Sequence, residues 1–119
     1  MHIGLCEGQH QMTQNNGEAL DGFIFSRVES PLNFDSHSNH VHEWLNNNKE
    51  ELEWGDVETL HLYVTGLTPL LTAFLKIWTG MYLHSADRKK MMVGGCLPRL
   101  VLMHYDRVNG IYLPQSYSE

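Results

Sequence analysis

Apolar residues gather in short runs along the chain, separated by stretches rich in Gly, Asn, Ser and Asp. The aromatic run at 22–28 and the alternating run at 60–64 predict two strands. Between them, apolar residues at helical spacing predict a helix from about 39 to 53, capped from within 35–38. Three consecutive asparagines at 46–48 leave two shorter helices as an alternative, because asparagine is a poor helix former.

The clearest local signal runs from the strand at 60–64 into a second helix. A glycine turn is followed by Thr68 as N-cap and Pro69 at the first helical position, where the missing N–H costs nothing. The apolar residues after it predict a helix over 68–79, with an end as late as 83 as the alternative. Residues 84–98 read as a loop with a basic run at 88–90, and residues 99–114 as a β-hairpin turning at Asn109-Gly110.

The predicted order of elements is therefore β-α-β-α-β-β, which is typical of the α/β class. We expect a small single-domain open sheet with a β-α-β unit, in which two parallel strands are joined by a right-handed crossover, and a C-terminal β-hairpin. Residues 1–20 are polar and without a clear period, so they are interpreted as a weakly ordered lead-in. The domain itself is expected to span residues 21–119.

Composition narrows the possible partners. The net charge of -6, from 8 Lys+Arg against 14 Asp+Glu, argues against binding to a nucleic acid polymer, whose phosphates an acidic surface repels. No apolar stretch has the length of a membrane span, and the first residues do not have the pattern of a signal peptide. With only Cys6 and Cys96, a disulfide framework is excluded, and a cytoplasmic protein with reduced thiols is expected.

Two segments could hold a small anionic ligand. The turn Thr65, Gly66, Leu67 and Thr68 would present free backbone N–H groups at a helix N-terminus, which attracts phosphate. If the two strands of the unit are parallel neighbours, Arg107 would lie at the same end of the sheet, with Tyr105 as an aromatic platform. The alternatives are an ordinary capped turn and an Asp106–Arg107 ion pair at the hairpin corner.

The spacing of the histidines does not favour a metal site. His37, His40 and His42 do not share one helix face, so they are interpreted as a polar loop and helix start, and no metal is expected. The basic run at 88–90 is interpreted as solvated loop, with the rim of an anion pocket as the alternative. No spacing identifies a nucleophile or an acid–base pair.

Two motifs, LYVTGLT at 62–68 before the apolar helix and LMHYDRxxGxYxPQ at 102–115, resemble the Thoeris anti-defence sponges of phages. The resemblance covers about half the chain. It implies a protein that sequesters a cyclic ADP-ribose-type signal, or a cyclic oligonucleotide, without cutting it. Such a protein needs no cofactor, works in the cytoplasm of the bacterial host, and is a homo-oligomer.

The resemblance also implies ligand contacts from Leu67, Thr68 and Arg107, with Arg27 as a further phosphate contact. Where family members often carry an amide, this chain has Lys76, which is a departure from the pattern. Self-association is expected independently, because the helix at 68–79 is too apolar for one buried stripe. The rival prediction is an enzyme, a small ring nuclease or phosphodiesterase with His37, His40, His42 or His104 as base. A third is an oligomeric α/β scaffold.

Overall fold

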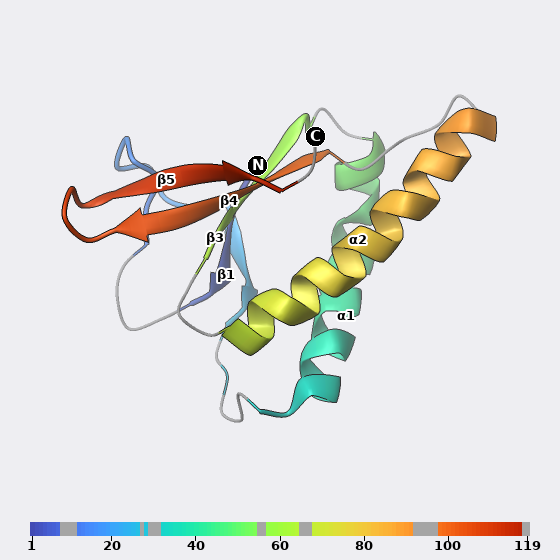
Figure 1. Cartoon of the computed structure of the whole chain (residues 1–119), viewed down its shortest axis with the longest axis horizontal. Helices are drawn as coiled ribbons and strands as arrows, with labels where there is room; N and C mark the ends of the chain where they lie inside the picture. The colour runs from blue at the N-terminus through green and yellow to red at the C-terminus, as the bar shows by residue number, and fades with distance from the viewer. Residues whose placement is uncertain are drawn as a thin grey trace.

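The computed structural model describes residues 1–7, 12–26, 28, 32–54, 57–64, 68–91 and 98–117, with the backbone alone for 53–54 and 81–91 (Figure 1). Along the chain these residues form β1 (His2–Cys6), β2 (Gly22–Phe25), α1 (Phe34–Trp54), β3 (Thr59–Tyr63), α2 (Thr68–Met91), β4 (Arg99–Asp106) and β5 (Ile111–Ser116).

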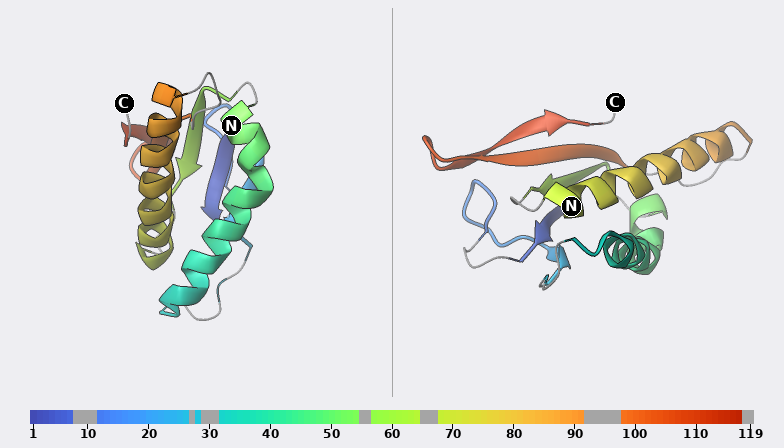
Figure 2. Two further views of the ribbon diagram at one scale, coloured as in Figure 1. Left: turned by 90° about the vertical axis from the view of Figure 1, so that its right-hand side faces the viewer. Right: turned by 60° about the horizontal axis from the view of Figure 1, so that its bottom comes forward.

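The strands form one sheet in the order β2-β1-β3-β4-β5. Strands β2, β1, β3 and β4 are parallel, and β5 returns antiparallel to β4. Helices α1 and α2 pack side by side on one face of this sheet, and the β4–β5 hairpin extends away from them (Figures 1 and 2). The α/β class, the parallel β-α-β unit of β3, α2 and β4, and the C-terminal hairpin are thus confirmed.

The direction of the crossovers decides what covers each face. The chain moves across the sheet in one direction from β2 to β3 and from β3 to β4, but in the opposite direction from β1 to β2. Because parallel crossovers are right-handed in nearly all proteins, the described part of the β1–β2 connection, residues 12–21, is expected on the face opposite the helices. Two observations agree with this: Leu20 and Phe23 lie over Gly4 of β1, and Asn15 hydrogen-bonds to Tyr112 of β5.

The core lies between the sheet and the two helices. Alternating leucines of β3 and β4 point to the helices because paired residues of parallel strands share a face. The side chains of Phe74 and Trp78 on α2 stack there, with ring centroids 5.6 Å apart. The fully buried residues of this layer include Leu5, Val41, Leu45, Leu60, Leu62, Leu70, Phe74, Trp78 and Leu100.

The expectation of a weakly ordered lead-in is wrong for the first residues. Strand β1 lies inside the sheet, between β2 and β3, and Ile3 and Leu5 belong to the core. A five-residue strand that contains a His and a Gly gives little sequence signal, and its burial comes from neighbours on both sides. Residues 1–6 therefore belong to the domain that was expected to begin at residue 21.

The two helices are also longer than predicted. Helix α1 is continuous through the three asparagines and begins at Phe34. Helix α2 continues to Met91, so the expected loop at 84–98, with its basic run at 88–90, is wrong as far as residue 91. Residues 81–91 contain no Gly or Pro and several strong helix formers, which allow the helix to propagate. Neither described helix is apolar enough over a sufficient length to cross a membrane.

Candidate functional site

The helix-free face of the sheet carries a line of aromatic side chains. They come from four strands and are named here the aromatic row: His2 on β1, His61 and Tyr63 on β3, Tyr105 on β4 and Tyr112 on β5. The register brings them to one face, because His2 is the partner of His61 and Tyr105 is the partner of Tyr112. In each strand the neighbouring residues point the other way, towards the helices.

The rings of the aromatic row contact one another in sequence. His2 stacks on His61 at 4.4 Å between centroids, with ring planes 8° apart. His2 Nδ1 lies 2.8 Å from the Tyr63 hydroxyl, which joins the stack to the tyrosines by a hydrogen bond. Tyr112 then packs edge-on against both Tyr63, at 4.9 Å, and Tyr105, at 5.2 Å. The row is therefore one connected set of ring contacts across four strands.

Burial keeps four side chains of the aromatic row uncharged. It lowers the pKa of His2, which the neighbouring His61 lowers further. Burial also lowers the pKa of His61, and the Met1 carbonyl only partly opposes this. The pKa values of Tyr63 and Tyr112 are raised, mainly by burial. At neutral pH the two imidazoles are thus neutral, and the phenols of Tyr63 and Tyr112 are protonated.

One end of the row is open to solvent. The Tyr105 side chain is 55% exposed, whereas Tyr63 is 1% exposed. At the other end, His61 Nδ1 is buried and has no hydrogen-bond partner among the described residues. An exposed aromatic ring continuous with a buried aromatic stack is suited to stacking of a planar heterocycle, such as a nucleobase.

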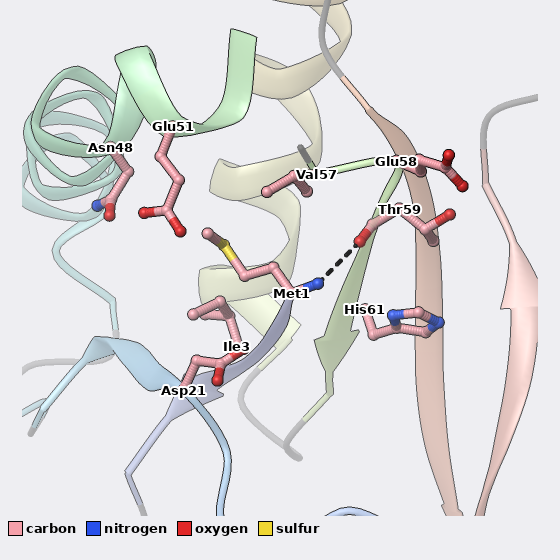
Figure 3. Close-up of a pocket in the computed structure, with 9 residues that line it drawn as sticks. All are labelled: Met1, Ile3, Asp21, Asn48, Glu51, Val57, Glu58, Thr59 and His61. Atoms are coloured by element: carbon pink, nitrogen blue, oxygen red, sulfur yellow. Dashed lines mark hydrogen bonds between the residues drawn. The ribbon is translucent and has the colours of Figure 1, made fainter. Parts of the chain in front are cut away.

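A cavity of about 650 Å³ lies beside His61, at the amino ends of β1 and β3 (Figure 3). Asp21, Glu51 and Glu58 contribute carboxylates to its wall, and Met1, Ile3 and Val57 contribute apolar surface. Among the described residues that line it there is no Lys or Arg. Carboxylates repel phosphate, so this cavity is not suited to the anionic part of a nucleotide.

Of the two halves of the predicted anion site, the structure describes Arg107 and, from the 65–68 turn, Thr68 alone. Tyr63 is the last residue of β3 in register with β4, opposite Met103, and β4 continues beyond it to Asp106. Arg107 lies in the hairpin turn, four residues past Met103, or roughly 13 Å further along at the usual rise of a strand. Thr68 instead begins α2, on the helix face, and is exposed. Thr65, Gly66, Leu67 and Arg27 lie outside the described residues.

The remaining predicted contacts divide between two elements. Tyr105 and Arg107 are close in sequence on the β4–β5 hairpin, and both are exposed. Lys76 is exposed on α2, on the opposite side of the sheet from the aromatic row. The structure therefore brings together Tyr105 and Arg107 but neither Lys76 nor Thr68 with them.

The hairpin turn does not contain the Asp106–Arg107 ion pair that was the alternative prediction. The Asp106 carboxylate accepts hydrogen bonds from the Val108 N–H at 2.9 Å and from the Asn109 side-chain amide at 2.6 Å. These bonds, that of Asn109 first, lower the pKa of Asp106. Within the described part of the chain no ion pair holds Arg107, so its guanidinium is free at the surface.

The four histidines considered as bases lie away from the aromatic row. His37 and His40 both pack on Phe25, edge-on and stacked respectively. His42 is exposed on α1, and His104 Nε2 lies 2.7 Å from the Gln115 side-chain oxygen. Among described residues, no three His, Cys, Asp or Glu side chains gather as a metal site.

Cys6 is buried, and burial raises the pKa of its thiol; Cys96 lies outside the described residues.

Sequence reasoning found Tyr105 but missed His2, His61, Tyr63 and Tyr112. The available signal was the alternation at 60–63, which places His61 and Tyr63 opposite the leucines. Comparison of the chain with family models, with curated proteins and with solved structures found no match. The resemblance to the anti-defence sponges therefore stays a prediction.

Proposed function

We propose that this protein binds a cyclic nucleotide signal and sequesters it without cleaving it. The ligand class proposed is a cyclic ADP-ribose isomer or a small cyclic oligonucleotide. The observation that carries this proposal is the aromatic row, which ends in an exposed tyrosine on the helix-free face of the sheet.

The hairpin arm supplies both kinds of contact that such a ligand needs. Tyr105 offers a ring face for a base, and Arg107 in the adjoining turn offers a guanidinium that has no ion-pair partner among the described residues. A guanidinium binds phosphate through parallel charge-assisted hydrogen bonds, and aromatic stacking tolerates any base. This pair replaces the combination of Arg107 with the 65–68 turn.

Binding is favoured over hydrolysis by the chemistry of the row. His2 and Tyr63 share a hydrogen bond, and among the described residues no carboxylate accepts a bond from a ring nitrogen of the row, whose two imidazoles are neutral. A protein that only has to hold its ligand requires no metal and no acid–base pair. In the sequence-based alternative, His37, His40, His42 or His104 would instead act as the base of a ring nuclease.

A homo-oligomer remains part of the proposal, but α2 no longer motivates it. The apolar residues at 70, 73, 74, 77 and 78 are buried within one copy of the chain, and those at 71 and 75 are half-buried. The side chains of this helix segment that are exposed are Thr68, Thr72, Lys76 and Thr79.

The test is incubation of the purified chain with cyclic ADP-ribose isomers and cyclic dinucleotides, followed by calorimetry. The complex is then heated, and the released ligand is analysed by chromatography. Recovery of intact ligand supports sequestration. Recovery of a linearised ligand would establish the enzyme instead, and absence of heat with every ligand would reject the nucleotide class.

Matched variants locate the site. Tyr105→Ala should weaken binding by removing the exposed ring, at a cost of about 1–3 kcal/mol per stacked base. Phe34→Ala is the control, because Phe34 is 58% exposed at the start of α1, away from the aromatic row. Equal effects of the two variants on affinity would place the ligand elsewhere.

A further inference from the structure

A small turn on the helix-free face reaches the outer edge of the sheet. Residues 13–19, named here the capping turn, are closed by a bridge between Thr13 and Ala19 and by the Gln14–Glu18 backbone bond of 2.9 Å. Gly17 allows the tight bend through its positive φ of 86°. This arrangement presents the Asn15 side chain from the bend of the turn.

Asn15 makes a double hydrogen bond to β5, 97 residues further along the chain. Its Nδ2 donates to the Tyr112 carbonyl at 3.0 Å, and its Oδ1 accepts from the Tyr112 N–H at 2.8 Å. Opposed residues in an antiparallel ladder exchange the same pair of bonds. The Asn15 amide therefore takes the place that a peptide group of a further strand would occupy.

The ladder shows which groups of β5 face outward. The backbone N–H of Tyr112 points outward to Asn15. The backbone groups of Pro114 and Ser116, at alternate positions, therefore also point away from β4. Pro114 has no N–H, which leaves Tyr112 and Ser116 as the outward donors on either side of it. The flanking Ile111 and Leu113 side chains are 40% and 47% exposed, so this edge has apolar neighbours as well.

The outward-facing backbone groups of Tyr112, Pro114 and Ser116 are self-complementary. An antiparallel pairing of two β5 strands centred on Pro114 would set Tyr112 of one copy opposite Ser116 of the other, in both directions. Such an arrangement has twofold symmetry, the commonest symmetry of a homodimer. Each hydrogen bond in it involves a backbone group of Tyr112, and Asn15 already holds both of these groups.

We propose that the outer edge of β5 is a latent self-association surface for a second copy of this chain, held closed by Asn15. Exposed edges with apolar flanks pair readily with other strands unless a proline, a charge or a covering loop blocks them. Here the capping turn covers Tyr112, and Pro114 removes the central donor. Movement of residues 13–19 away from β5 would open the surface. The argument for this proposal does not rest on the proposed nucleotide binding.

The experiment compares Asn15→Ala, the control Asn47→Ala on the exposed side of α1, and the double variant Asn15→Ala/Ser116→Pro. Light scattering after size exclusion is measured over a range of protein concentrations, with wild type as reference. Asn15→Ala should shift the mass towards twice that of wild type at high concentration. The control should not, and Ser116→Pro should reverse the shift, because it removes the other outward donor.

Two results would overturn the proposal. Unchanged mass of Asn15→Ala, together with rapid hydrogen exchange at the Tyr112 amide, would show an open edge that does not pair. Association that persists in the double variant would show pairing through another surface. If Asn15→Ala does not fold, Asn15→Gln carries the same test, since its amide is displaced by one methylene without a cavity or a charge.

Discussion

Replacing Arg107 with alanine tests the proposed phosphate contact with little effect on the fold. Arg107 is exposed in the hairpin turn, and the turn is held by the bonds of Asp106 to Val108 and Asn109. Because the guanidinium has no ion-pair partner among the described residues, the substitution should change the free energy of unfolding by no more than about 0.5 kcal/mol.

The cost should therefore appear in binding. A charge-assisted hydrogen bond contributes about 1.5–3 kcal/mol net, so Arg107→Ala should weaken the cyclic nucleotide by roughly 10- to 150-fold. Arg107→Lys should recover only part of this, because an ammonium lacks the planar pair of donors. Calorimetry on both variants measures the affinity, and a matched thermal melt measures stability.

Two outcomes would refute the reasoning. Unchanged affinity in Arg107→Ala would remove the turn from the binding site. A large fall in the melting temperature would show that Arg107 has a structural role that the free guanidinium does not indicate. Lys49→Ala, which removes an exposed cation from α1, controls for the change in net charge.

Further predictions concern the face that carries the aromatic row. Gly4→Ala should destabilise the fold by about 1–3 kcal/mol in a denaturant titration, because a Cβ there would overlap the Phe23 ring. The matching Gly22→Ala change should cost less, because a Cβ there makes only an ordinary contact with Ile3, and equal costs would contradict the close packing at Gly4. Stability should fall as the pH drops through the unfolded-state His value of 6.5, because burial lowers the pKa of His2 and of His61 in the folded state, so the unfolded chain binds more protons there. The double variant His2→Gln/His61→Gln should show a flatter pH dependence of the free energy of unfolding, and an unchanged slope would assign the effect to other groups.

The α/β pattern could be predicted because it depends on local signals. The alternation at 60–63, the Thr68-Pro69 start of a helix and the Asn109-Gly110 turn each act within a few residues, and each lies in an element of the predicted type. Strand β1 could not be predicted in this way, because its burial depends on β2 and β3, which pair with it on both sides.

The candidate site was harder to predict for the same reason. The aromatic row needs the register of four strands, and His2 meets His61 only because β1 enters between β2 and β3. The sequence-based site also assumed that adjacent parallel strands end at the same level. Strand β4 instead continues past the end of β3, which carries Arg107 out along the hairpin and away from Thr68.

The chain crosses the sheet in the reverse direction between β1 and β2, and this explains several contacts on the helix-free face. Because that crossover runs opposite in direction to the other two, right-handedness favours the helix-free face for its described residues 12–21. The same segment brings Asn15 to the edge of β5 and Asp21 to the His2 backbone N–H at 2.8 Å. The described part of this connection is thus used to close the sheet edge, and the Tyr105 end of the row remains exposed. If access to the row and closure of the edge depend on one segment, ligand binding to wild type should slow hydrogen exchange at the Tyr112 amide. Exchange at Tyr112 that is unaffected by a bound ligand would show that the two are separate properties of the fold.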